Sequence, residues 1–230
     1  MSTGKSHRGL GLSEALRLDM HVHSSFSHDG VEPPARLVKR AAEIGLDGLA
    51  ITDHNTQRGV GEAIDAGREL GIIVIPGVEV SCREGHILAY GSEDFGIAAG
   101  QAVGEVLSAV KAHHPTCIAA PAHPFDIYRA GMGWAAAKHP FDAVETVNSH
   151  SVLPRSVVRS LATKMGVGEI GGSDTHVLRG LGGGLTLVSA NKGPILQGIA
   201  KAGRASGGFD PLSMLMGRLA RSRRDREHGV

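Results

Sequence analysis

The sequence lacks the features that mark most secreted, membrane-spanning and nucleic-acid-binding proteins. Only 3% of its 230 residues are aromatic, the formal net charge is +1, and there are two cysteines. Cys82 and Cys117 are too few for a disulfide framework and form no C-x-x-C pair of the kind that binds structural zinc. No apolar run approaches the ~20 residues of a membrane span, and Met1 to Ala15 contains no stretch of signal-peptide length. We therefore expect a protein of the reduced cytoplasm, without a membrane partner.

The remaining composition is typical of a globular protein. Hydrophobic residues make up 41% of the chain and charged residues 20%. A chain of this length can form one α/β domain and is short for two. The composition changes once, after Gly208, where arginines crowd a short segment. We therefore expect a barrel domain over residues 1–208 and a basic C-terminal tail over residues 209–230.

Short apolar runs alternate with segments of helical periodicity. The predicted strands are residues 18–23, 48–53, 72–80, 117–122, 142–147, 169–174 and 185–189. Residues 86–90 follow the third strand too soon for a helical crossover, so we expect a return strand or a local hairpin there. Repeated β-α units form either an open sheet or a closed barrel. Polar residues at the ends of many strands favour a TIM-like α/β barrel, whose active site is built from those ends.

Histidines and carboxylates gather at these predicted strand ends. His21 and His23 are two residues apart on a strand, so their side chains share one face. Similar residues follow later strands: Asp53, His54, Glu79, His123, Asp174 and His176. Burying so many ionisable groups together is costly unless a cation neutralises them. We therefore predict a metal centre, and imidazole and carboxylate ligands favour zinc, manganese or iron.

Short motifs in a fixed order carry a resemblance to a known family. They are H-x-H from His21, T-D-H-N from Thr52, G-V-E ending at Glu79, H-I-L-A-Y-G from His86, A-H-P around His123 and G-S-D-T-H ending at His176. Over about residues 18 to 190 this pattern resembles the polymerase and histidinol phosphatase (PHP) superfamily. The resemblance implies a distorted seven-stranded (β/α) barrel, up to three metal ions and phosphoesterase activity.

The resemblance also implies a set of protein ligands for each of two or three divalent ions. One ion would be held by His21, His23, Glu79 and Asp174. A second, to which Glu79 bridges, would be held by His86 and His123. The third would be held by Asp29, His54 and His176. Asp29 competes with His28 for its place, and His86 lies at the start of its predicted strand, not at the end.

The expected positive charge of the ions indicates how hydrolysis would proceed. Neighbouring ions lower the pKa of a bridging water, so we expect hydroxide to attack phosphorus without a side-chain nucleophile. Glu79, as the bridging ligand, and Asp53 are the predicted catalytic carboxylates; Asp53 either orients a ligand imidazole or is a simple loop acid. Arg129 is a candidate phosphate-binding residue or a surface arginine. Asn148 is a candidate substrate donor or a turn cap.

Three classes of function are consistent with these residues. The leading hypothesis is a metal-dependent phosphoesterase that acts on a small phosphorylated metabolite or nucleotide. The same site also suits hydrolysis of a carboxyl ester or a carbamate. The arginine-rich tail suggests an exonuclease or nucleic-acid-binding protein, but the chain has few aromatic side chains on which bases would stack. The sequence does not indicate the oligomeric state.

Overall fold

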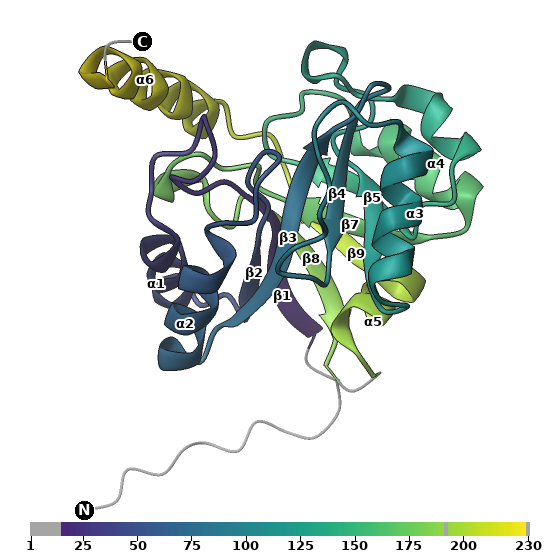
Figure 1. The fold of residues 1–230 in the computed structure, drawn as a ribbon, viewed down its shortest axis with the longest axis horizontal. Helices are drawn as coiled ribbons and strands as arrows, with labels where there is room; N and C mark the ends of the chain where they lie inside the picture. Colours follow the sequence, from purple (N-terminus) through teal and green to yellow (C-terminus); the bar gives the residue numbers. More distant parts are fainter. Residues whose placement is uncertain (1–14, 191–192, 229–230) are drawn as a thin grey trace, which may run out of the picture.

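The computed structural model describes residues 15–190 and 193–228 (Figure 1). The strands are β1 (Ala15–Val22), β2 (Gly48–Ile51), β3 (Ile73–Ser81), β4 (His86–Tyr90), β5 (Ile118–Pro121), β6 (Ala143–Asn148), β7 (Gly168–Gly172), β8 (Gly184–Ser189) and β9 (Arg204–Gly207). The α-helices are α1 (Pro34–Glu43), α2 (Val60–Leu70), α3 (Val103–His113), α4 (Arg155–Met165), α5 (Ile195–Ala202) and α6 (Pro211–His228). The 3₁₀ helices are η1 (Ile127–Arg129), η2 (Gly133–Lys138) and η3 (Leu178–Gly180). Residues 1–14, nearly all of the segment in which we expect no signal peptide, lie outside the described residues.

The strands form a curled mixed sheet and a separate strand pair. The larger sheet has the order β5-β4-β3-β2-β1-β8-β9, and β6 pairs with β7. Strands β1, β2 and β3 are parallel to one another, as are β6 and β7. Strands β4, β5, β8 and β9 join their neighbours in antiparallel fashion. The pair lies beside the edge strand β5 and beside β1, since Asp142 N donates to Ala119 O at 2.9 Å and Asp174 N donates to His21 O at 2.7 Å.

One apolar core lies inside the curl, and two lie between the strands and the outer helices. The inner core takes residues from each of β1 to β8, among them Met20, Ile75 and Ile170. Helices α1 and α2 cover one outer side and α3 and α4 the other (Figure 1). Helix α1 shows why the sequence forms these elements: Pro34 suits the first turn of a helix, and Leu37 and Ala41 fall on one buried face. The site described below is therefore carried by strands packed on both surfaces.

The structure confirms the α/β class but not a complete TIM-like barrel. Among residues 15–190 and 193–228 the strands divide into two sheets, and the larger one is mixed. The return strand expected at residues 86–90 is confirmed as β4. Because only residues 82–85 separate it from β3, no helical crossover fits, and the parallel β-α repeat of a TIM barrel is interrupted there.

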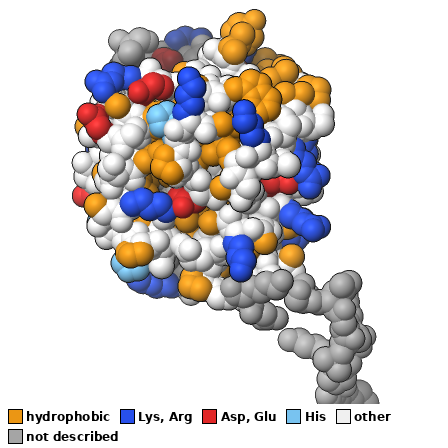
Figure 2. Space-filling model, turned by 90° about the vertical axis from the view of Figure 1, so that its right-hand side faces the viewer, with side chains coloured by type: hydrophobic (Ala, Val, Ile, Leu, Met, Phe, Trp, Pro, Cys, Tyr) orange, Lys and Arg blue, Asp and Glu red, His pale blue; other side chains and the backbone are white. Residues whose placement is uncertain are grey.

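The segment expected to be a basic tail contains helix α6, which projects at the upper left of Figure 1. On the face shown in Figure 2, Lys and Arg side chains are scattered among uncharged and acidic ones, without a continuous basic patch. No helix in the described part of the chain has the length and apolar character needed to cross a membrane.

Two local features determine the position of the carboxyl end of β1, which carries His21. The register of β1 against β2 shifts between Asp19 and Val22, and the Tyr90 hydroxyl donates to the Met20 carbonyl at 2.7 Å within this irregularity. Gly172, at the end of β7, lies so close to β1 that a methyl group on it would be 2.2 Å from the Cβ atom of His21. Only glycine permits this approach, which brings the segment after β7 beside His21.

Candidate metal centre

The nine candidate ligands predicted from the sequence converge at one end of the strands. They are His21, His23, Asp29, His54, Glu79, His86, His123, Asp174 and His176, and each is buried or nearly so. Most follow the carboxyl end of a strand. His86 begins its strand, but β4 runs antiparallel to β3 and pairs Ser81 with His86. The start of β4 therefore lies at the same edge as the end of β3, which explains how His86 reaches the site.

Four donor groups meet around a single point. His21 Nε2 lies 3.1 Å from His23 Nε2, 3.0 Å from Glu79 Oε2 and 3.5 Å from Asp174 Oδ1. His23 Nε2 lies 3.3 Å from Glu79 Oε2 and 3.1 Å from Asp174 Oδ1. Four ligands placed tetrahedrally at bond lengths of about 2.0–2.1 Å from zinc are about 3.3 Å apart. The spacing of these four atoms thus matches the coordination shell of one small divalent ion.

The second oxygen of Glu79 faces a different pair of imidazoles. Glu79 Oε1 lies 3.0 Å from His86 Nδ1 and 3.1 Å from His123 Nε2. The bridge that pairs His54 with Glu79 puts the ends of β2 and β3 side by side, and His54 Nδ1 lies 3.4 Å from Glu79 Oε2. The carboxylate of Glu79 is therefore shared between two groups of donors.

A third group forms around Asp29. Asp29 Oδ2 lies 2.9 Å from His176 Nε2 and 3.3 Å from His54 Nε2, and His23 belongs to the same cluster. The Ser27 hydroxyl donates to the other oxygen of Asp29 at 2.6 Å. His28, the alternative, has a side chain that is 70% exposed and lies 3.9 Å from Asp29. The geometry favours Asp29 over His28 as the donor.

The electrostatics of these groups fit a cation. Burial alone lowers the pKa of His23, but hydrogen bonds to Asp174 and Glu79 raise it to about 10. Burial raises the pKa of Glu79, yet the charges of His21 and His54 hold it well below its usual range. Converging imidazoles and ionised carboxylates suit divalent metal ions better than a self-contained hydrogen-bond network.

Glu145, which the sequence analysis missed, supports two of the donors. Its Oε1 lies 2.8 Å from His21 Nδ1, the ring nitrogen that faces away from Glu79, and its Oε2 accepts from the His123 backbone N–H at 2.6 Å. His123 has a φ of 28°, which a non-glycine residue adopts only when its surroundings hold it. The available signal was an acidic residue in the interior of the strand predicted at residues 142–147, whose other acidic residue, Asp142, stands at its start.

Asp53 does not make the contact that we expected. Its buried carboxylate accepts from the Ser24 N–H at 2.5 Å and from the Ser24 hydroxyl at 2.6 Å. No imidazole is among its hydrogen-bond partners in the described part of the chain, whereas the carboxylate of Glu145 contacts the ring of the candidate ligand His21. Asp53 instead fixes the turn that follows His23, and burial raises its pKa.

Arg129 and Asn148 both reach the centre through Asp174. The Arg129 guanidinium donates to Asp174 Oδ2, and also to Asp126 at 2.8 Å and Ser151 at 3.0 Å. The Asn148 amide donates to the same Asp174 oxygen at 3.1 Å. Burial opposes the charge of Arg129, but the carboxylates of Asp174 and Asp126 raise its pKa. Both residues thus contact Asp174, a candidate ligand, and their role toward a substrate stays a prediction.

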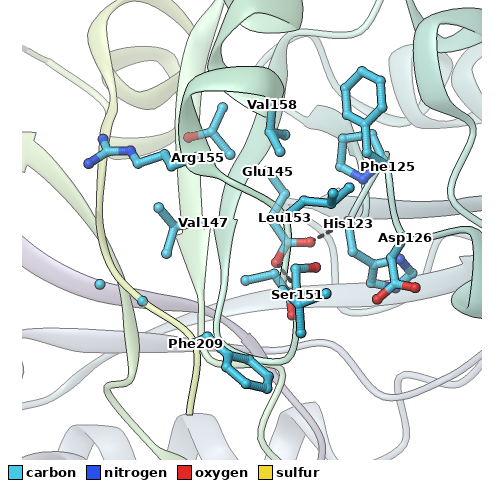
Figure 3. Close-up of a pocket in the computed structure, with 16 residues that line it drawn as sticks. His123, Phe125, Asp126, Glu145, Val147, Ser151, Leu153, Arg155, Val158 and Phe209 are labelled. Carbon is cyan, nitrogen blue, oxygen red and sulfur yellow. Dashed lines mark hydrogen bonds between the residues drawn. The ribbon is translucent and has the colours of Figure 1, made fainter. Parts of the chain in front are cut away.

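Seven of the nine candidate ligands, all except His21 and His23, line a cavity of about 510 Å³. His150 also lines it and has donor atoms near those of Asp174 and His176; the sequence indicated only its proximity to Asn148. A smaller pocket of about 130 Å³ shares His123 and Asp126 with this cavity. Figure 3 shows Glu145 near the middle of the smaller pocket, beside His123, with Phe209 at the opposite side. The cavity thus has polar walls at the donors and an adjoining, more apolar recess.

Comparisons with known proteins agree with this arrangement. The PHP domain model matches residues 19–139, and the PHP-associated model matches residues 155–205. An uncharacterised protein of Methanocaldococcus jannaschii is 30% identical over 146 residues, which cover 59% of this chain and 83% of that protein. A phosphoribosyl 1,2-cyclic phosphate 1,2-diphosphodiesterase of Eggerthella lenta is 39% identical over 82 residues, which cover 33% of this chain and 31% of that enzyme.

A solved structure shares the fold. It is a two-domain protein of Bacteroides vulgatus containing a predicted PHP-like metal-dependent phosphoesterase, with a TM-score of 0.71 and 21% identity over 89% of this chain and 70% of that one. The PHP domain match covers residues 19–139 of 230, more than half of the chain. It contains the donors from His21 to His123. The chain belongs to the PHP domain family.

Proposed function

We propose that this protein hydrolyses phosphate esters with two or three divalent ions of zinc, manganese or iron, held by the nine candidate ligands. The observation that carries the proposal is the divided carboxylate of Glu79. One oxygen lies 3.0 Å from His21, and the other lies 3.1 Å from His123. A carboxylate that faces two donor groups in this way is suited to bridge two ions, and sites with two ions are common in phosphoester hydrolysis.

Bound divalent ions supply an activated water and positive charge for the phosphoryl oxygens. The residues of the chain have separate tasks. Glu145 orients the His21 ring, and Asp53 holds the turn after His23 through Ser24. Arg129, held by Asp126 and Asp174, carries a fixed positive charge at the mouth that attracts a phosphate. Asn148 places an amide beside the same carboxylate as Arg129.

The proposed substrate is a small phosphorylated molecule. The cavity of about 510 Å³ lies within the ~300–1,000 Å³ typical of small-molecule sites. The diphosphodiesterase activity named for the Eggerthella lenta relative is consistent with a phosphate ester substrate, although that match spans under a third of the enzyme. Hydrolysis of a carboxyl ester or carbamate at the same site, and exonuclease action, are competing hypotheses that substrate profiling separates.

The test is hydrolysis by protein reconstituted separately with zinc, manganese and iron. The substrates are p-nitrophenyl phosphate, bis-p-nitrophenyl phosphate and p-nitrophenyl acetate, each before and after chelation. We expect chelator-sensitive release from a phosphate ester, lost in Glu79→Ala and retained in Glu43→Gln, a matched exposed glutamate on α1. Turnover of the acetate alone would replace the proposal with carboxyl-ester hydrolysis. Absence of turnover with all three metals would contradict the proposal.

A further inference from the structure

Helix α6 forms one wall of the cavity that holds the candidate ligands. Met214, Gly217, Arg218 and Arg221 line this cavity together with Asp29, His54 and Glu79. These four positions are spaced by three or four residues, so they occupy one face of the helix. A methyl group on Gly217 would lie 3.5 Å from the Cβ atom of His176, which places the helix in contact with a candidate ligand.

The helix is attached to the loop that carries Asp29. The Arg224 guanidinium donates to the Ser27 carbonyl at 3.3 Å, to the Ser25 carbonyl at 3.4 Å and to the Gly30 carbonyl. At the other end of the helix, Ser213 is buried against Gly180, where an added methyl group would lie 2.0 Å from the Ser213 hydroxyl. The arginines between these two anchors therefore have a defined position over the cavity.

Arg218 and Arg221 have unused hydrogen-bonding capacity. Arg221 has a long contact of 3.6 Å with Asp29 Oδ2, and its buried Nε atom has no partner in the described part of the chain. Arg218 is exposed, lines the cavity and makes no hydrogen bond or ion pair with any residue in the ranges 15–190 and 193–228. Arg129 differs, because its donors are engaged by Asp126, Asp174, Asn148 and Ser151.

We propose that Arg218 and Arg221 bind a second phosphate of the substrate, at the wall of the cavity that α6 forms. This inference rests on the proposed function, since it takes the scissile phosphate to lie at the candidate ligands. Arginine is suited to this task because its planar guanidinium binds phosphate at two points and stays charged. The site would then prefer small molecules with two phosphate groups over those with one.

The test uses analogues that cannot be hydrolysed, with the metal-loaded full chain. Isothermal titration calorimetry compares α,ω-alkane bisphosphonates of two to six carbons with alkylphosphonates of the same lengths. We expect at least one bisphosphonate to bind on the order of tenfold more tightly than its partner, as a charge-assisted contact provides. The double variant Arg218→Ala/Arg221→Ala should lose this preference. Arg223→Ala, an exposed arginine of α6 outside the cavity lining, should keep it.

No preference in the wild type at any length would overturn the proposal, and so would a preference that the double alanine variant retains. Circular dichroism checks that the double variant keeps its helix. If it does not, Arg218→Lys/Arg221→Lys replaces it: a weakened preference supports the proposal, and an unchanged one overturns it. Phosphate release from butyl phosphate and from butane-1,4-diyl bisphosphate, measured on the same wild-type samples, tests the proposed function separately. Absence of release from both substrates, together with a preserved bisphosphonate preference, would refute the phosphoesterase and leave the anion site standing.

Discussion

His21 and Glu145 form a buried pair in which the carboxylate lies 2.8 Å from Nδ1, on the far side of the ring from the donor group. Both side chains are inaccessible to solvent. This contact fixes the ring orientation and directs Nε2 toward Glu79 and His23. A carboxylate behind a ligand imidazole also makes the ring a stronger base, which strengthens metal binding.

Glu145→Gln should weaken metal binding without unfolding the protein. The amide keeps the size of the side chain but removes its charge, and we expect an affinity loss of about 10–100-fold, typical of such supporting contacts. Competition against a fluorescent chelator measures this change. Glu43→Gln is the control, and equal affinities for Glu145→Gln and wild type would show that the contact has no such role.

Arg129→Ala should lower kcat/KM for a phosphate ester by about 10–100-fold, because it removes a fixed positive charge at the mouth of the cavity. The kcat/KM of Arg129→Lys should fall between the values of Arg129→Ala and wild type, since lysine restores the charge but not the planar guanidinium. Steady-state kinetics at constant metal loading measure both. A value for Arg129→Ala within about twofold of wild type, as expected for the exposed control Arg36→Ala, would remove Arg129 from the site.

Metal-free protein should lose stability as the pH rises from 7 to 10. Burial lowers the pKa of His23, but Asp174 and Glu79 raise it from 6.5 to about 10. The folded state therefore binds this proton more tightly, so its stabilising effect is complete below about pH 6.5 and is lost as the pH approaches 10. Metal affinity should rise over the same range, because a bound ion must displace the proton.

Thermal unfolding in excess chelator and chelator competition measure these two pH trends. His23→Gln should reduce the loss of stability between pH 7 and 10. This variant separates the contribution of His23 from that of lysines and tyrosines elsewhere in the chain. A thermal midpoint that is constant or rises between pH 7 and 10 in the metal-free wild type would disagree with the raised pKa.

Gly172→Ala should separate β7 from β1. The new methyl group would lie 2.2 Å from the Cβ atom of His21, so backbone must move. Overpacking of this kind costs about 1–3 kcal/mol, and Asp174 would move away from His21. We expect a lower thermal midpoint and weaker metal binding. Gly61→Ala is the control, because no atom lies within 4 Å of a methyl group there; equal metal affinity in the two variants would argue against the role of Gly172.

The parts of the site that follow from strand ends could be predicted from the sequence. Apolar runs before His23, His54 and Glu79 indicate strands β1, β2 and β3, and parallel strands bring their carboxyl ends to one edge. His86 could be placed there only through the resemblance. The reason for its position is the antiparallel direction of β4, which the short connection after β3 suggested but did not establish.

Features that depend on tertiary contacts could not be predicted in this way. Glu145 lies inside a strand, and its partner His21 is 124 positions away. The arginines of residues 209–230 suggested a solvated tail because composition does not reveal that Arg224 binds the carbonyls of a distant loop. The split of the strands into two sheets likewise depends on long-range pairing. The cytoplasmic location expected from the two cysteines stays a prediction.

The most direct test of the account is the metal content of the wild type and Glu79→Ala after reconstitution with manganese or zinc and removal of excess ion. Elemental analysis should give two or three equivalents in the wild type and at most one in Glu79→Ala, because the bridging carboxylate serves two donor groups. Glu43→Gln should match the wild type, and circular dichroism should show all three folded. Less than one equivalent in the wild type, or an undiminished content in folded Glu79→Ala, would contradict the bridged centre.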